Sequence, residues 1–91
     1  MTKRREKAEV LYDMLSALWA NRRGLKPTHL IYKSNISHVR LKKHIDELLD
    51  KGMVKEGTGE GGHIVYKITE KGIDFLKEFE RMRKFMDSFG L

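Results

Sequence analysis

The chain has 91 residues, no cysteine and a formal net charge of +6. This length corresponds to one domain, and the lack of cysteine excludes disulfides, thiolate catalysis and sulfur-ligated metals. No apolar run reaches the roughly 20 residues of a membrane span, and no signal-peptide apolar region follows the basic start. We therefore expect a soluble, cytoplasmic protein without a membrane partner.

The positive charge belongs to the first half of the chain. Residues 1–30 carry seven basic and three acidic side chains, residues 31–51 carry five and three, and the rest is neutral overall. This asymmetry favours a polyanionic partner, DNA or RNA, over a small acidic substrate. A thermophile's lysine- and glutamate-rich surface is the alternative that the charge content alone leaves open.

Apolar residues at every third or fourth position predict a first helix over about Lys3 to Asn21. The expected buried stripe comprises Val10, Leu11, Met14, Leu15, Leu18 and Trp19. A short second helix is predicted from Pro27 to Lys33, because proline is well placed in a first helical turn. Ser34 and Asn35 end it, since both side chains bond readily to nearby backbone.

The third helix has the clearest start and stop signals. Ser37 is a good N-cap, and Gly52 suits the position after the C-terminus. Ile36 is expected to pack on Leu41 as a hydrophobic staple. The predicted buried stripe is Leu41, Ile45, Leu48 and Leu49, and the opposite face and its flanks hold Val39, Arg40, Lys42, Lys43, Asp46 and Asp50. This outward face is therefore basic in its first two turns and acidic in its last.

Two strand-like runs, Met53 to Glu56 and His63 to Ile68, flank a glycine-rich segment that predicts a flexible hairpin loop. Thr69 then caps a last helix that runs to about Ser88. The expected fold is mainly α (α+β), a winged helix-turn-helix with a two-stranded wing and a long C-terminal dimerisation helix. Residues 1–72 are the predicted DNA-binding domain, and residues 73–91 the dimerisation helix of the same structural unit.

A short helix, a tight turn and a capped basic helix, followed by a hairpin, suit the major groove of double-stranded DNA. The first turns of such a helix meet base edges, so Arg40 is predicted to pair with guanine and Val39 to touch a thymine methyl. The predicted DNA-binding residues are His38, Val39, Arg40, Lys42, Lys43, Lys33, Lys55, His63 and Lys67. A solvated helical face is the alternative role for the helical members of this set.

Other chemistries have weaker support. Gly57, Gly59 and Gly62 match a dinucleotide-binding motif, but a strand rather than a helix follows them. His44 lies near the edge of the buried stripe, where packing or hydrogen bonding is its expected role. No two of the four histidines have the spacing of a helical metal site. We expect no cofactor, no metal, no small-molecule ligand and no enzymatic activity.

The runs at residues 28–37, 41–43, 48–49, 51–54 and 66–72 resemble small archaeal winged-helix transcriptional regulators. They are also similar to the small archaeal winged-helix chromatin proteins with a C-terminal coiled coil. The resemblance covers about residues 8–80 and implies a DNA-binding dimer whose last helices pair antiparallel. One departure is the wing tip, residues 58–62, which has an acid and no base. Wings of this type often place Arg or Lys there, so we expect little sequence reading from this one.

The last helix carries a second signal. Phe75, Phe79, Met82, Met86 and Phe89 are spaced by four, three, four and three positions, a heptad-like seam that Phe85 widens. Pairing with a second copy of the chain covers these side chains. Packing against the first helix of the same chain is the alternative.

The leading hypothesis is a homodimeric transcriptional regulator that binds double-stranded DNA and is associated with the chromosome. A general nucleoid or chromatin protein with little sequence preference is the first alternative. The others are a winged-helix protein-interaction module and an RNA-binding protein.

Overall fold

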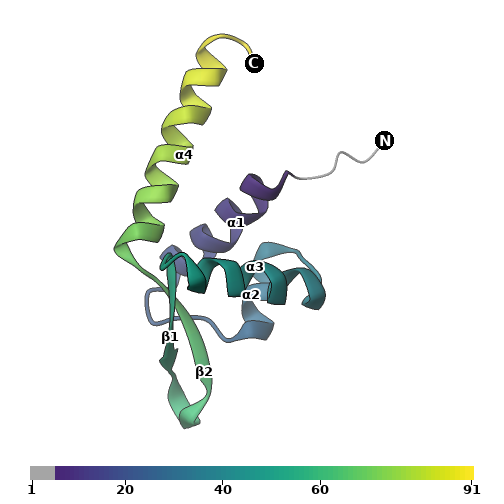
Figure 1. Cartoon of the computed structure of the whole chain (residues 1–91), viewed down its shortest axis with the longest axis vertical. Helices are drawn as coiled ribbons and strands as arrows, with labels where there is room; N and C mark the ends of the chain where they lie inside the picture. Colours follow the sequence, from purple (N-terminus) through teal and green to yellow (C-terminus); the bar gives the residue numbers. More distant parts are fainter. Residues whose placement is uncertain (1–5) are drawn as a thin grey trace.

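The structure, a computed structural model, describes residues 6–91, and its helices enclose a core from which a two-stranded wing and one long helix project (Figure 1). The elements in chain order are α1 (Lys7–Ala20), α2 (Pro27–Ser34), α3 (His38–Asp50), β1 (Val54–Thr58), the 3₁₀ turn η1 (Glu60–Gly62), β2 (Ile64–Ile68) and α4 (Glu70–Ser88). This is the predicted winged helix-turn-helix. Within residues 6–91, no helix is both long and apolar enough to cross a bilayer.

Both predicted helix caps are confirmed. Ser37 Oγ accepts a hydrogen bond of 3.2 Å from the Arg40 amide at the start of α3. Thr69 Oγ1 accepts one of 3.2 Å from the Gly72 amide at the start of α4. Each bond satisfies one of the amides that the first turn of a helix leaves without an intrahelical partner.

The predicted ends of the first two helices need correction. Glu6 has an extended backbone with ψ 155°, so the described helix begins at Lys7 and not at Lys3. The predicted positions Lys3, Arg4 and Arg5 lie outside the described residues. Ser34 is the last residue of α2, one position beyond the predicted end, because the left-handed backbone of Asn35 (φ 54°) forms the C-cap.

One hydrophobic core joins the helices to the base of the wing. Its buried members are Val10, Met14, Leu15, Leu18, Leu25, Leu30, Ile36, Leu41, Ile45, Leu48, Val54, Ile68 and Leu76. Ile36 and Leu41, the predicted staple pair, both belong to it. Leu11, Trp19 and Leu49 were expected in the buried stripes but lie half-buried at its edge. On α3 the fourth buried position belongs to His44 instead.

The hairpin ladder extends further toward the tip than the predicted six-residue loop at residues 57–62 allows. β1 and β2 pair antiparallel from Val54 opposite Ile68 to Thr58 opposite Ile64. Gly57 and Thr58 therefore belong to the ladder, and a 3₁₀ turn closes the tip. A further partner comes from the α1–α2 connection, where Leu25 exchanges backbone hydrogen bonds of 3.0 and 2.9 Å with Tyr66.

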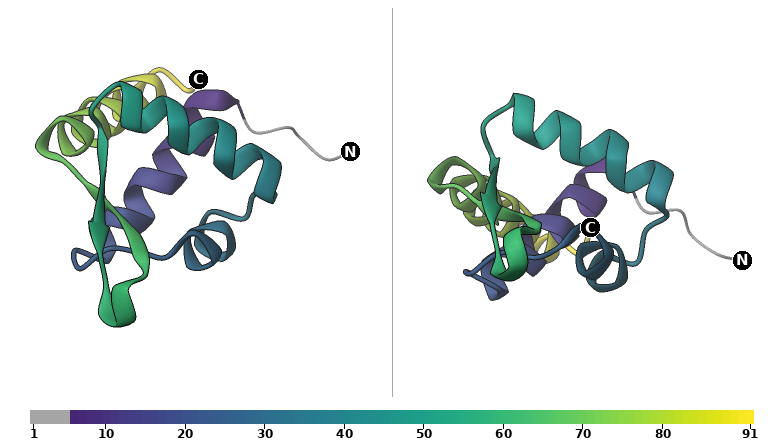
Figure 2. Two further views of the ribbon diagram at one scale, coloured as in Figure 1. Left: turned by 60° about the horizontal axis from the view of Figure 1, so that its bottom comes forward. Right: turned by 90° about the horizontal axis from the view of Figure 1, so that it is seen from below.

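α4 is buried only in its first half. Gly72, Leu76 and Phe79 pack against the rest of the chain, whereas every residue from Glu80 onward is exposed. Helix and wing meet closely at Gly72, where a Cβ atom would collide with the Met53 carbonyl oxygen. The second half of the helix extends away from the other elements (Figure 1), so α4 is foreshortened when the molecule is seen from below (Figure 2).

Candidate DNA interface

α3 presents its first two turns to solvent. Leu41, Ile45 and Leu48 point into the core, and the 3.6-residue period of the helix turns the positions between them outward. Five predicted residues are exposed here: His38, Val39, Arg40, Lys42 and Lys43. Val39 is 80% exposed, so an apolar side chain stands among cationic ones, as contact with a thymine methyl requires.

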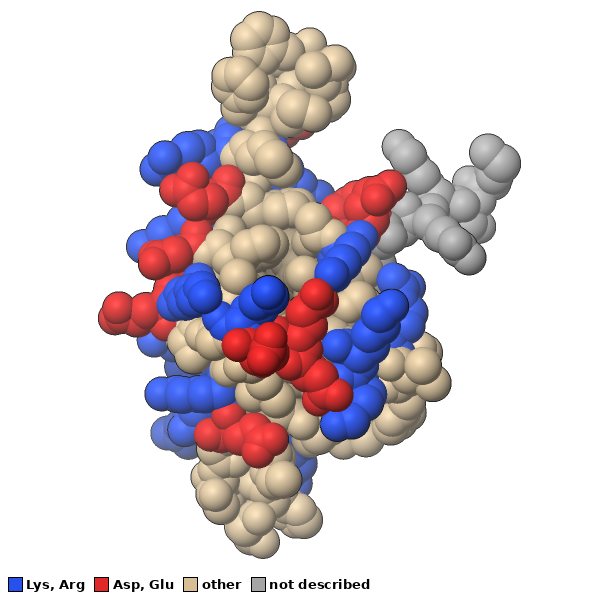
Figure 3. All heavy atoms as spheres, viewed as in Figure 1, with Lys and Arg blue, Asp and Glu red and all other residues tan. Residues whose placement is uncertain are grey.

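The charges on this face change along the helix. In Figure 3 basic groups gather over the right-hand, N-terminal end of α3, and acidic groups lie over its middle. Lys42 Nζ is 3.1 Å from Asp46 Oδ1, an ion pair between exposed side chains one turn apart. Lys42 is therefore partly neutralised within α3, and Arg40 and Lys43 are the cations of this face for which no ion pair is formed among the described residues.

One flank of α3 lies beside the wing. The pKa of Tyr66 on β2 is raised, first by its burial and then by the Glu56 carboxylate. Lys42 and Asp46 also act electrostatically on the Tyr66 hydroxyl, so the Lys42–Asp46 pair and this face of β2 are neighbours. Strand β1 of the wing packs against α3.

The other flank of α3 is tied to the start of α1. Lys7 Nζ donates to Glu47 Oε2 at 2.7 Å, and this bond lowers the pKa of the Glu47 carboxyl. His44, on the same flank, is only 5% exposed, and its Nδ1 has no hydrogen-bond partner among the described residues. Burial lowers the pKa of His44, and the nearby Arg40 guanidinium lowers it further.

The predicted wing residues do not share the face of the wing that lies beside α3. Lys55 and Lys67 are direct cross-strand partners, so both lie on the same face of the hairpin. The Lys67 side chain passes over Gly57 and Gly24. Glu56 and Tyr66, also partners, occupy the opposite face. His63 is exposed next to the tip.

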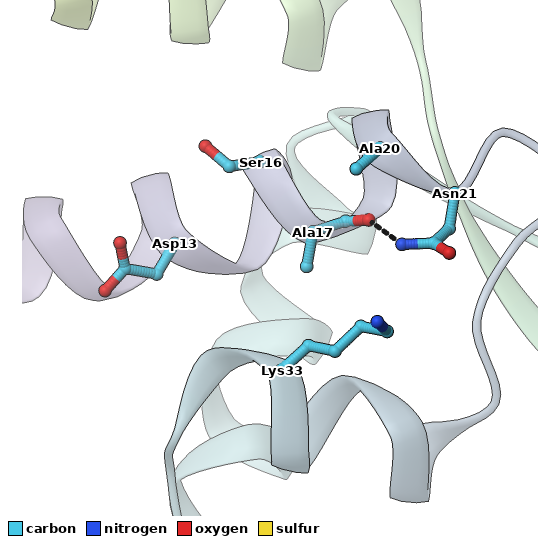
Figure 4. A pocket seen from close by; sticks show the side chains of 6 residues that line it. All are labelled: Asp13, Ser16, Ala17, Ala20, Asn21 and Lys33. Carbon is cyan, nitrogen blue, oxygen red and sulfur yellow. Dashed lines mark hydrogen bonds between the residues drawn. The ribbon is translucent and has the colours of Figure 1, made fainter.

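Lys33 is separated from the α3 group. It lies with Asp13, Ser16, Ala17, Ala20 and Asn21 along an open groove between α1 and α2, and its side chain extends toward the end of α1 (Figure 4). Asn21 donates from its side chain to the Ala17 carbonyl oxygen at 2.8 Å in the same groove. Lys33 is therefore not part of the exposed group at the start of α3.

The predicted set omitted an aromatic side chain of the helix-turn-helix. Tyr32 is 82% exposed on α2, on the side opposite the buried Leu30. The exposure of Tyr32 could have been predicted from the period of α2, since residues two positions apart on a helix point about 200° apart. An exposed phenol can donate a hydrogen bond to a phosphate oxygen, which makes Tyr32 a candidate contact.

Comparison with known proteins assigns the fold to a family. A family model described as winged helix-turn-helix matches residues 4–87. The chain belongs to the winged helix-turn-helix family. A comparison with curated protein sequences gives no match.

Among solved structures, this chain is similar to Sso10a-2, a DNA-binding protein from Sulfolobus solfataricus. The identity is 28% over 93% of this chain and 85% of that one, with a TM-score of 0.75. It is also similar to MepR, a transcription regulator of a multidrug efflux pump in Staphylococcus aureus, at 15% identity, 88% and 60% coverage and a TM-score of 0.77. A MepR–DNA complex matches with 15% identity, 87% and 58% coverage and a TM-score of 0.73. The winged-helix chain thus spans about 60% of the length of MepR.

The buried His44 predicts a loss of stability in mild acid. Its folded pKa lies below the ordinary value of 6.5, so the unfolded chain binds the proton first and the free energy of unfolding falls as the pH drops from 7.5 to 5.5. The fall ends once the pH is below the folded pKa. The groups facing the ring are Arg40, Lys43 and Glu47 on α3 and Lys7 on α1.

Urea unfolding at a fixed protein concentration measures this effect. His44→Leu is expected to show a flatter dependence of unfolding free energy on pH, because a titratable ring no longer has to stay neutral. His63→Gln, a change at an exposed histidine, is the matched control and keeps the wild-type dependence. If the unfolding free energies of the wild type and of His44→Leu depended equally on pH, this role of His44 would be excluded.

Proposed function

We propose that this winged-helix protein is a chromosome-associated, cytoplasmic transcriptional regulator that binds double-stranded DNA as a homodimer. The observation that carries the proposal is the orientation of α3. Its apolar stripe is buried, its N-terminus is capped by Ser37, and its first two turns expose Arg40 and Lys43 around Val39. A helix with this distribution fits the major groove with its N-terminal turns on the base edges.

The comparisons support DNA as the partner. Sso10a-2 is a DNA-binding protein that is similar over nearly the whole chain. MepR has the same fold, and it has been crystallised with DNA. MepR is a transcription regulator, which favours regulation over mere coating of the chromosome.

Each exposed side chain has a proposed task. Arg40 donates two hydrogen bonds to a guanine edge, and Val39 contacts a thymine methyl. Lys43 and His38 bind the phosphates beside the groove. Lys42 contributes less, because its ammonium already pairs with Asp46 at 3.1 Å. Asp46 and Asp50 keep the last turns of α3 away from phosphate.

The wing and the α1–α2 turn add contacts to the backbone of the duplex. Lys55 and Lys67 lie together on one wing face, and exposed Arg22 and Arg23 lie in the turn before Leu25. Contacts of this kind position a protein on DNA without reading sequence. The wing tip itself has no base, so the proposal assigns sequence reading to α3 alone.

Dimerisation supplies the second reading helix. The exposed apolar side chains in the second half of α4 and directly after it are Met82, Phe85, Met86, Phe89 and Leu91. Their burial against a second copy places two α3 helices in successive major grooves about 34 Å apart. A second half-site raises the affinity of the dimer for DNA without a new kind of contact, because the second α3 then binds intramolecularly.

A general chromatin protein is the second candidate function. The similarity to Sso10a-2, described only as DNA-binding, favours it. The two functions differ in sequence preference, since a regulator binds its own promoter about 10³-fold or more tightly than unrelated DNA. A coating protein binds both almost equally.

A titration of the protein with duplex DNA at several salt concentrations tests DNA binding itself. Neutralisation of about six phosphates predicts a slope near −5 in a plot of log affinity against log salt. Competing RNA of equal length is expected to displace the protein only at higher concentration than DNA. A slope near zero, or the recovery of a constant protein partner with no DNA retardation at low salt, would select the protein-interaction module instead.

Arg40→Ala tests the reading helix. The loss of a bidentate contact with guanine is expected to weaken binding to the preferred site by about 1–3 kcal/mol and to relax base preference at one position per half-site. Arg81→Ala, an exposed arginine on α4, is the matched control for charge and is expected to bind DNA as wild type does. If both variants lose affinity equally and keep the same preference, Arg40 acts only through its charge.

A further inference from the structure

One acidic side chain lies in the row of α3 that faces away from the core. Asp46 follows Val39 by seven positions, so it points within about 20° of that exposed valine on a helix of 3.6 residues per turn. Lys43 lies between the two in the same row, and the Asp46 side chain is exposed. A carboxylate at this place repels the phosphates that the basic face attracts. General affinity for DNA therefore does not account for the position of Asp46.

Asp46 belongs to an ion pair that lies beside the wing. Lys42, one turn earlier, brings its Nζ to 3.1 Å from Asp46 Oδ1, and the two side chains are 76% and 54% exposed. Both groups act electrostatically on the Tyr66 hydroxyl of β2. Exposed pairs of this kind contribute little to stability. The pair presents to solvent a group that only donates hydrogen bonds next to a group that only accepts them.

A G·C base pair has the complementary pattern on its edge in the major groove. Guanine offers two acceptors, N7 and O6, and the cytosine paired with it offers its N4 amino group as a donor. An ammonium next to a carboxylate matches this edge, with Lys42 on guanine and Asp46 on cytosine. Guanine or thymine opposite the carboxylate would bring acceptors together, and adenine has an acceptor, N7, beside its amino group. Unfavourable contacts with the wrong bases are one source of specificity.

We propose that the Lys42–Asp46 pair reads one G·C base pair in the major groove, with Lys42 donating to guanine and Asp46 accepting from the cytosine amino group. The inference rests on the DNA binding proposed above and adds a base preference to it. Asp46 lies six residues after Arg40, which is about 9 Å along the helix axis at 1.5 Å per residue. Because base pairs stack about 3.4 Å apart, the ion pair and Arg40 read different base pairs of one half-site.

The ion pair contributes more to preference than to affinity. It carries no net charge, so it adds little to the salt-dependent attraction between the protein and phosphates. Its effect is the difference between the right base pair and a wrong one. A well-placed pair of hydrogen bonds to a base edge discriminates roughly tenfold or more.

Selection from a pool of random duplexes, followed by sequencing of the bound fraction, tests the inference with Asp46→Asn. The wild type is expected to enrich a cytosine paired with guanine at one position per half-site. Asparagine donates as well as accepts and pairs with N6 and N7 of adenine. Asp46→Asn is therefore expected to lose roughly tenfold of the cytosine preference and to favour adenine at that position. Its thermal unfolding is expected to match that of the wild type, since the pair is exposed.

Asp50→Asn is the matched control, because Asp50 is the exposed last residue of α3. The loss of one negative charge is expected to raise the affinity of both variants for all duplexes, but only Asp46→Asn changes the preferred base.

Lys42→Ala tests whether the two groups act on one base pair. It is expected to weaken the preference for guanine at the same position. The double variant with Asp46→Asn is expected to change its preference by less than the sum of the single changes, because the two side chains share one contact. Additive changes would place Lys42 and Asp46 on different base pairs and overturn the proposal.

Two further outcomes would overturn the proposal while binding to DNA stands. One is an unchanged base preference in Asp46→Asn with a higher affinity for every duplex, as in Asp50→Asn, which would show that Asp46 only repels phosphate. The other is a wild type that binds all duplexes alike. A wild type that binds no duplex at low salt would instead overturn the proposed DNA binding and this inference together.

Discussion

The burial of one apolar stripe of α3 is the constraint on which the rest of the structure depends. Leu41, Ile45 and Leu48 are each at most 5% exposed, and each contributes roughly 1.5–3 kcal/mol by leaving water. Rotation of α3 by one residue would bring charged side chains such as Lys42 and Asp46 toward the core, so the orientation of the helix about its axis is fixed. The direction of Val39, Arg40 and Lys43 follows from that rotation and not from any contact of their own.

The ion pairs around α3 affect the distribution of charge on this helix more than they affect its stability. The Lys7–Glu47 pair ties one flank to α1, and the Lys42–Asp46 pair lies beside Tyr66 of the wing. Exposed ion pairs contribute little stability, but these two neutralise charges on the sides of the helix. Unpaired positive charge is left mainly at its N-terminal end, where a reading helix meets DNA.

The sequence predicted the features that depend on local chemistry and missed those that depend on packing between elements. The caps Ser37 and Thr69 follow from residue type, and the α3 stripe follows from helical period. The packing of elements distant in sequence decides the other positions. It places Lys33 in the α1–α2 groove and both Lys55 and Lys67 on one face of the wing. The strands also extend through Gly57 and Thr58 because Val65 and Ile64 are available as partners, which glycine content alone does not predict. The caps and stripe therefore defined the reading helix, whereas its basic neighbours could be assigned to faces only from the structure.

We propose that the first two turns of α3 contact DNA. NMR spectroscopy of the labelled protein locates this contact if the backbone amide signals are followed as a short duplex is added. The largest shifts are expected at residues 37–43, with smaller shifts along the wing and little change along the first half of α4. Shifts concentrated in the groove around Lys33 or on α4, with residues 37–43 unmoved, would exclude α3 as the contact.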